Sequence, residues 1–184
     1  MNELKKPIII AITGVSGGGK TALVTHLAKH INNAEALFFD DYDLHGPEDV
    51  LEWVDRGANP HEWDLKPIAR DLEELLEQPL DYIFLDYPFA YQHTRIKEYI
   101  DLAVFVDTPL DLALARRISR DFHDSSEEEI VAQVNYYASH GRRAYIHMLN
   151  KIQPDSDLIV DGTLTIKDLG DQLMEKVGKQ WSTR

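Results

Sequence analysis

The chain contains no cysteine among its 184 residues. This absence excludes disulfides, thiolate metal sites and cysteine nucleophiles, and it fits a reducing compartment, so we expect a cytoplasmic location. No apolar run is long enough to cross a membrane, and the start of the chain lacks the pattern of a secretory signal. We therefore expect no membrane association.

Basic residues are also scarce, with 19 Lys and Arg against 32 Asp and Glu, for a net charge of −13. A surface of this sign repels DNA and RNA, so we expect a small-molecule partner and no nucleic acid. The length fits one α/β domain, and neither a repeat nor a linker is visible. We expect a single domain over residues 1–184. The oligomeric state stays open, a homodimer included.

The most informative feature that is present is an eight-residue run, Gly-Val-Ser-Gly-Gly-Gly-Lys-Thr, which fits G-x-x-x-x-G-K-[ST]. It follows an apolar run, Ile8–Ile12, and precedes a helical pattern, which is the context that a phosphate-binding loop requires. Lys20 should reach the β- and γ-phosphates, and the Thr21 hydroxyl should hold Mg²⁺. We expect ATP and Mg²⁺ as cofactors, with the nucleotide bound by Gly14, Ser16, Gly17, Gly18, Gly19, Lys20 and Thr21.

Strand and helix patterns alternate along the rest of the chain, which predicts a parallel sheet covered by helices. Further strands are expected at 36–39, 82–85, 102–106 and 158–160. Helices are expected at 21–30, 49–54, 110–122, 126–149 and 166–177, and from an N-cap at Asp64 to about Gln78.

Each strand after the first ends in an acidic residue, and ligands bind at this edge of a parallel sheet. Asp86 follows four apolar residues, the Walker-B pattern, and is expected to hold Mg²⁺. The pair Asp40 and Asp41 suits the orientation and deprotonation of an acceptor hydroxyl. A helix cap or a turn is the alternative, and we favour it for Asp107 and Asp161.

Other side chains suit phosphoryl transfer less specifically. Arg116, Arg117 and Arg120 share a predicted helix and could stabilise transferred charge, although surface ion pairs are the alternative. His26 and His30 have a metal-chelating spacing, but without a third ligand we expect a packed or surface pair. An acceptor pocket could be built by Tyr42, Trp53, Trp63, Tyr87, Phe89 and Tyr91, for each of which core packing is the alternative.

Taken in order, the motifs resemble the uridine kinase and phosphoribulokinase family of P-loop kinases, which includes nicotinamide riboside kinases. Phe39-Asp40-Asp41-Tyr42 is similar to the Q-D-[DS]-[FY] element, whose first acid is the acceptor base. The segments 60–64 and 157–162 are similar to P-x-A-[FW]-D and A-D-x-I-[IV]-x-x-G, and 116–121 resembles R-R-[IV]-x-R-D, which leads into an arginine-bearing lid.

This resemblance implies a three-layer P-loop NTPase fold with a small helical lid at about 116–145. It implies transfer of phosphate from ATP to a hydroxyl of a small molecule, a nucleoside or riboside-like compound first of all. The expected catalytic residues are Asp40, Lys20, Arg116 and Arg120. The expected acceptor-binding residues are Asp41, Tyr42, Trp63 and Tyr87.

Some positions differ from the family pattern. Ala58 stands where uridine kinases carry a ribose-holding aspartate, and the segment 122–126, directly after Asp121, carries no arginine. Arg142 and Arg143 are candidates to supply the missing lid charge. The alternative function is an ATP-binding regulatory or accessory module with only slow ATP hydrolysis, which would be indifferent to small hydroxylated compounds.

Overall fold

A parallel sheet runs through the centre of the molecule in the computed structural model, which describes residues 6–181. Its five strands lie in the order β2-β3-β1-β4-β5. They are β1 (Ile8–Gly14), β2 (Ala34–Phe38), β3 (Tyr82–Asp86), β4 (Leu102–Asp107) and β5 (Leu158–Asp161). All pairings are parallel, so the carboxyl ends of the strands meet at one edge. The predicted α/β fold is confirmed.

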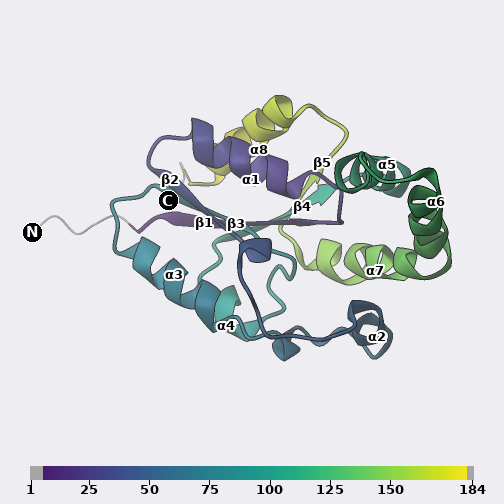
Figure 1. Ribbon diagram of the computed structural model, residues 1–184. Helices are drawn as coiled ribbons and strands as arrows, with labels where there is room; N and C mark the ends of the chain where they lie inside the picture. The colour runs from purple at the N-terminus through teal and green to yellow at the C-terminus, as the bar shows by residue number, and fades with distance from the viewer. Residues whose placement is uncertain (1–5, 182–184) are drawn as a thin grey trace, which may run out of the picture.

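Helices cover both faces of this sheet, as Figure 1 shows. One layer holds α1 (Lys20–His30) and α8 (Ile166–Trp181), and the opposite layer holds α3 (Lys66–Leu76) and α4 (Thr94–Lys97). Beyond the carboxyl edge lie α2 (Val50–Asp55), α5 (Leu110–Asp121), α6 (Glu127–Tyr136) and α7 (Arg142–His147). The last three form a helical arm at the position expected for the lid.

Alternation along the strands divides the core between the two layers, because successive side chains of a strand point to opposite faces. Ile9 and Ala11 pack with α3, whereas Ile10 and Ile12 pack with α1 and α8. These β1 side chains are fully buried, as expected for a central strand covered on both faces.

The helical arm departs from the prediction of one regular helix over 126–149. Ser126 begins it with the expected capping box, in which Glu129 Oε2 accepts the Ser126 N–H. The helix then contains two π-helical segments, Tyr137–Gly141 and Met148–Ile152, on either side of α7. Insertions of this kind shift the helix face, so α7 presents a different side to the sheet edge than a regular helix would.

Two smaller predictions need correction. The N-cap of α3 is Leu65 rather than Asp64, whose carboxylate instead accepts a hydrogen bond from the Lys66 N–H. The short helix α4 was not predicted, because four residues carry too little periodicity to be recognised. Within residues 6–181, no helix has the length and apolarity that crossing a membrane requires. The N-terminal segment 1–5, part of the start considered for a signal, lies outside the described residues.

Leu173 of α8 is fully buried against α1, so Leu173→Ala should leave a cavity in this layer. We expect the free energy of unfolding to fall by about 2–5 kcal/mol, the usual cost of deleting a buried leucine side chain. Urea unfolding followed by circular dichroism measures the change. The control is Lys176→Ala, at an exposed position one turn away, which should change stability by less than about 0.5 kcal/mol.

Candidate active site

The phosphate-binding loop connects β1 to α1 and requires glycine at two places. Gly17 has φ 77°, and a Cβ there would lie 2.1 Å from the Ala113 carbonyl oxygen of α5. Gly19 is the N-cap of α1 with φ 97°, in the left-handed region that glycine adopts without strain. The loop is therefore held close to α5, with the N-terminus of α1 directed to the place where an anion binds.

Thr108, which the sequence reasoning did not select, fixes the loop from the end of β4. Its hydroxyl is buried and donates a 2.7 Å hydrogen bond to the Gly18 carbonyl. Gly162 fits beside it, since a Cβ at that glycine would lie 1.8 Å from Thr108 Oγ1. The only sequence signal was the Thr-Pro pair after a strand, which also fits an ordinary helix start.

Three side chains meet at the carboxyl end of β3. The Thr21 hydroxyl donates to Asp86 Oδ2, and Lys20 Nζ lies 3.7 Å from Asp86 Oδ1. Burial raises the pKa of Asp86, and the Lys20 charge and the Thr21 hydrogen bond oppose this rise. Mg²⁺ prefers hydroxyl and carboxylate oxygens, so the chemistry of Thr21 and Asp86 fits this ion. The predicted strand-end position of Asp86 thus places it against the phosphate-binding loop.

A groove of about 600 Å³ runs from this loop along α1 and is lined by Lys20, Arg116 and Arg120. Arg116 donates a 2.9 Å hydrogen bond to the Gly162 carbonyl, and Arg120 is paired with Asp121. Arg117 also faces Asp121, at 3.7 Å. Arg116 and Arg120 therefore line the groove beside the loop, and both Arg120 and Arg117 form the ion pairs named as the alternative.

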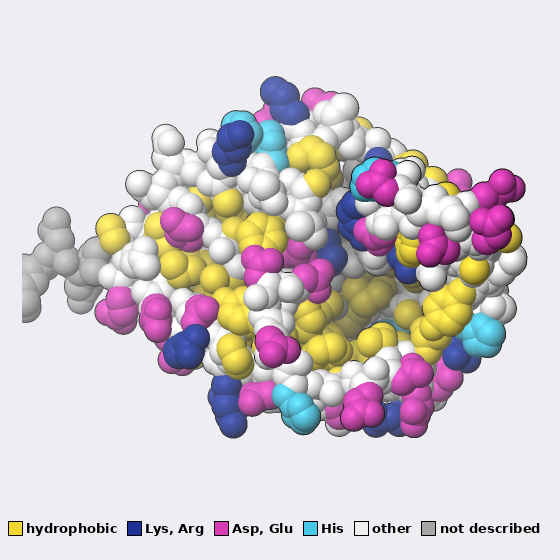
Figure 2. Space-filling view, viewed as in Figure 1, with side chains coloured by type: hydrophobic (Ala, Val, Ile, Leu, Met, Phe, Trp, Pro, Cys, Tyr) yellow, Lys and Arg dark blue, Asp and Glu magenta, His cyan; other side chains and the backbone are white. Residues whose placement is uncertain are grey.

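A second cavity, of about 380 Å³, opens on the other side of the loop, between α2, α7 and the carboxyl edge of the sheet. Figure 2 shows its mouth as a hollow with a largely hydrophobic floor. Its neck is polar and its walls are aromatic or aliphatic. The neck is formed by Ser16, Lys20, Asp40 and Asp86, and the walls by Phe39, Val50, Trp53, Val54, Ala58, Trp63, Phe89, Ala144, Met148 and Ile152.

The walls of this cavity are held in place by specific contacts. Arg143 of α7 forms a 3.1 Å ion pair with Asp55 of α2, which joins the two helices across the mouth. The Trp53 indole N–H donates to the Asn59 carbonyl, at 2.9 Å. Arg143 thus connects the lid to α2 and does not supply charge at the phosphate end.

Trp63 is supported from behind by His93, which is buried. Its Nε2 lies 3.2 Å from the Trp63 carbonyl oxygen, and its Nδ1 accepts the Arg95 N–H. Burial lowers the pKa of His93 and keeps the ring neutral, so that one nitrogen can donate while the other accepts.

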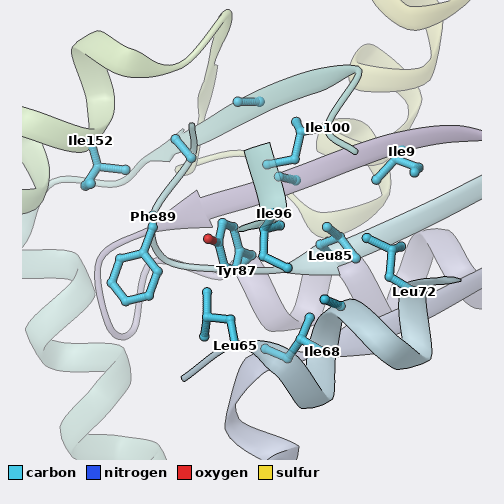
Figure 3. Close-up of a cluster of buried hydrophobic side chains, with 14 of the residues drawn as sticks. Ile9, Leu65, Ile68, Leu72, Leu85, Tyr87, Phe89, Ile96, Ile100 and Ile152 are labelled. Carbon is cyan, nitrogen blue, oxygen red and sulfur yellow. The ribbon is translucent and has the colours of Figure 1, made fainter. Parts of the chain in front are cut away.

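Three of the residues expected to bind an acceptor lie elsewhere. Tyr87 is buried in the core between Phe89 and Ile96, as Figure 3 shows. The Tyr42 hydroxyl donates to Asp71 of α3, and the exposed Asp41 does not line the cavity. The cavity therefore brings together Lys20, Asp40, Asp86 and Trp63 from the predicted set, and adds Trp53 and Phe89 from the wider group of aromatics.

The two histidines of α1 pack against each other. The rings of His26 and His30 stack at 4.2 Å, and His30 Nδ1 lies 2.8 Å from the His26 carbonyl oxygen. No group of three or more potential metal-binding His, Asp or Glu side chains occurs between residues 6 and 181.

Comparison with known proteins identifies the family. Residues 58–167 match the profile described as the Phosphoribulokinase / Uridine kinase family, which is more than half of the chain. This chain belongs to that family. The predicted membership is thereby confirmed, and with it a P-loop kinase relationship that extends beyond the loop itself.

Relatives of this kinase-family chain span nearly its whole length. It is 26% identical to a uridine kinase of Streptococcus equi subsp. zooepidemicus, with 85% of this chain and 88% of that protein covered. It is 23% identical to a uridine kinase of Lactobacillus helveticus, with 87% and 89% covered.

Solved structures share the fold at lower identity. A deoxyadenosine kinase from M. mycoides with bound dATP superposes with a TM-score of 0.54 at 16% identity, covering 93% of this chain and 99% of that one. A putative fructose transport system kinase from Silicibacter sp. TM1040 has a TM-score of 0.57 at 17% identity, with 86% and 92% covered.

Thr108→Val removes the hydroxyl that fixes the phosphate-binding loop while keeping the side-chain shape. Because a buried hydrogen bond contributes about 1 kcal/mol, we expect the affinity for ATP to fall by roughly fivefold to tenfold. Calorimetry measures the affinity for ATP. The control is Thr94→Val, since Thr94 lies away from the loop and its hydroxyl contacts His61. Equal affinities for Thr108→Val and the unchanged protein would show that Thr108 does not position the loop.

The lowered pKa of His93 predicts a loss of stability in mild acid. Below its ordinary value of 6.5 the unfolded state binds more protons than the folded state, so the free energy of unfolding falls as the pH falls. Urea unfolding at about pH 7.5 and about pH 5.5 should show this decrease. His93→Asn, which retains a cap for the Arg95 N–H, should show a smaller decrease; an equal one would assign the effect to other groups.

Proposed function

We propose that this chain transfers the γ-phosphoryl group of ATP to a hydroxyl of a small molecule that is nucleoside-like or riboside-like. One observation carries the proposal: a single cavity joins the phosphate-binding loop, two carboxylates and a pocket of aromatic side chains. The names of the relatives, uridine kinase and deoxyadenosine kinase, support an acceptor of this class.

Each part of the neck has a chemical role in this proposal. Lys20 binds the phosphates, and Thr21 with Asp86 would hold Mg²⁺, which neutralises charge on the phosphate oxygens when it is bound. Asp40 lines the same cavity as Ser16 and Lys20 of the loop, which supports a role beside the acceptor hydroxyl. It orients this hydroxyl and takes its proton as the new O–P bond forms and the bond to the ADP oxygen breaks.

The two arginines beside the loop, Arg116 and Arg120, supply further positive charge for the phosphates. Arg116 is held by the Gly162 carbonyl and faces the nucleotide groove. The hydrogen bond to Asp121 raises the pKa of Arg120, and the Asp40 charge adds a smaller effect in the same direction. Both guanidinium groups are therefore placed to stabilise charge that spreads over the transferred phosphoryl group.

The test is release of ADP from ATP and Mg²⁺ in the presence of nucleosides, ribosides, pantothenate and sugars, with Lys20→Ala as the inactive control. One class of compound should raise turnover far above the rate without acceptor. A response to none of them, with ATP still bound, would contradict the proposal and favour a regulatory ATP-binding module.

Asp40→Asn should lower acceptor-dependent turnover by roughly 10²-fold or more and leave ATP binding nearly unchanged, because it removes only the base. Asp41→Asn decides which of the paired aspartates acts, and its exposed side chain predicts a small effect. Asp43→Asn, also exposed, is the matched control. Unchanged turnover in Asp40→Asn would remove Asp40 from the mechanism.

A further inference from the structure

The walls of the acceptor cavity offer few polar side chains beyond its neck. Among the lining residues, only Gln92 and His147 carry polar side chains other than the indole N–H groups and the groups at the phosphate end. The Gln92 amide already donates to the Lys151 carbonyl, and the Trp53 N–H to the Asn59 carbonyl. Away from the phosphate end, the Gln92 side-chain oxygen and His147 are the partners left for hydroxyls, so an acceptor with several hydroxyls would leave some of them unpaired against these walls.

The aromatic side chains form one connected surface. Trp63 packs edge-on against Phe39 at 5.3 Å and against Trp53 at 6.3 Å, and Phe89 contacts both tryptophans. Such a surface favours a flat ring, through apolar area and edge-to-face contacts. The Trp63 indole N–H is buried without a hydrogen-bond partner among the described residues, so the surface that Trp63 presents to the cavity is apolar.

The charges around the cavity exclude an anionic acceptor. Asp40 and Asp86 lie at the neck, and Lys20, the cationic residue among the lining side chains, faces Asp86. Arg143 lies at the mouth but is paired with Asp55. His147 is kept neutral, because burial and the nearby Lys151 lower its pKa. A carboxylate or phosphate on the acceptor would meet no unpaired cation here.

We propose, resting on the function proposed above, that the acceptor is an aromatic or heteroaromatic alcohol that carries no anionic group and has few hydroxyls besides the one that is phosphorylated. The ring lies among Phe39, Trp53, Trp63 and Phe89, and the reacting hydroxyl lies at Asp40. Within the nucleoside-like class this favours compounds with a hydroxyl-poor sugar. It disfavours polyols, phosphorylated sugars and carboxylic acids.

The test compares uridine, 2′-deoxyuridine and 2′,3′-dideoxyuridine, which lose one hydroxyl at each step and keep the reacting one. A second pair, 2-phenylethanol and 1-phenyl-1,2-ethanediol, repeats the comparison on another ring. Affinity by calorimetry and kcat/KM by ADP release are both measured. In at least one series, each removed hydroxyl should improve both values by roughly fivefold or more, the effect of no longer burying an unpaired polar group.

Substitutions of Ala58 test whether the apolar cavity wall causes the preference for hydroxyl-poor compounds. It is buried, lines the cavity and has φ 51°, a conformation that asparagine and glycine accept. Ala58→Asn adds a polar partner and should reduce the preference for the hydroxyl-poor compound by roughly fivefold. Ala58→Gly keeps the wall apolar and should leave the preference unchanged, so it controls for backbone effects.

The outcomes separate this inference from the proposed function. Binding with the expected preference but without transfer for any compound contradicts the proposed function and supports the inference. Transfer that is equal or better for uridine and the diol overturns the inference and leaves the kinase. Binding of none of these ring compounds, or stronger binding of pantothenate as an anionic probe, also overturns it.

Discussion

The carboxylate of Asp86 lies where water reaches it poorly, at the end of a strand that is buried on both faces. Burial alone would favour its neutral form, and the Lys20 charge and the Thr21 hydroxyl oppose that effect. In the function proposed above, the same three groups face the phosphates and the Mg²⁺ ion. The contact therefore joins β3 to the phosphate-binding loop in the protein alone and becomes the charged floor of the site when nucleotide binds.

Two compartments of opposite character meet at this floor. The nucleotide side is open and carries Arg116, Arg120 and the glycine-rich loop. The acceptor side is narrower and mostly apolar, and it is covered by α2 and α7, which the Asp55–Arg143 pair connects. In the function proposed above, this division keeps charge at the phosphate end and gives the acceptor apolar surroundings, which favours transfer to an alcohol over hydrolysis of ATP.

Local patterns were sufficient to predict the five strands, the major helices and the phosphate-binding loop, because each depends on periodicity or on a fixed spacing. The alternation of side chains along a strand also explains why Tyr87, an expected acceptor-binding residue, does not line the cavity. Tyr87 continues the alternation of Ile83 and Leu85, which face the core layer of α3, so its side chain enters that layer and not the cavity. The alternation along β3 thus favours core packing, the alternative named for Tyr87, over a place in the cavity.

Other features depend on contacts between distant segments and could not be read locally. The role of Thr108 requires that β4 lie beside the loop, a consequence of the strand order. The π-helical segments around α7 leave no clear mark in the sequence, yet they accompany the face that presents Ala144, His147 and Met148 to the cavity. The Tyr42 hydroxyl donates a hydrogen bond to Asp71 of α3, a partner that no motif indicated.

Transfer from ATP to the acceptor requires that the two compartments meet at the γ-phosphate. A crystal structure with a non-hydrolysable ATP analogue and Mg²⁺ tests it most directly. The account predicts the γ-phosphate against Lys20 at the neck of the aromatic cavity, with Asp40 within hydrogen-bond reach of an acceptor oxygen placed there. A γ-phosphate turned away from this cavity, or separated from it by side chains, would contradict the account.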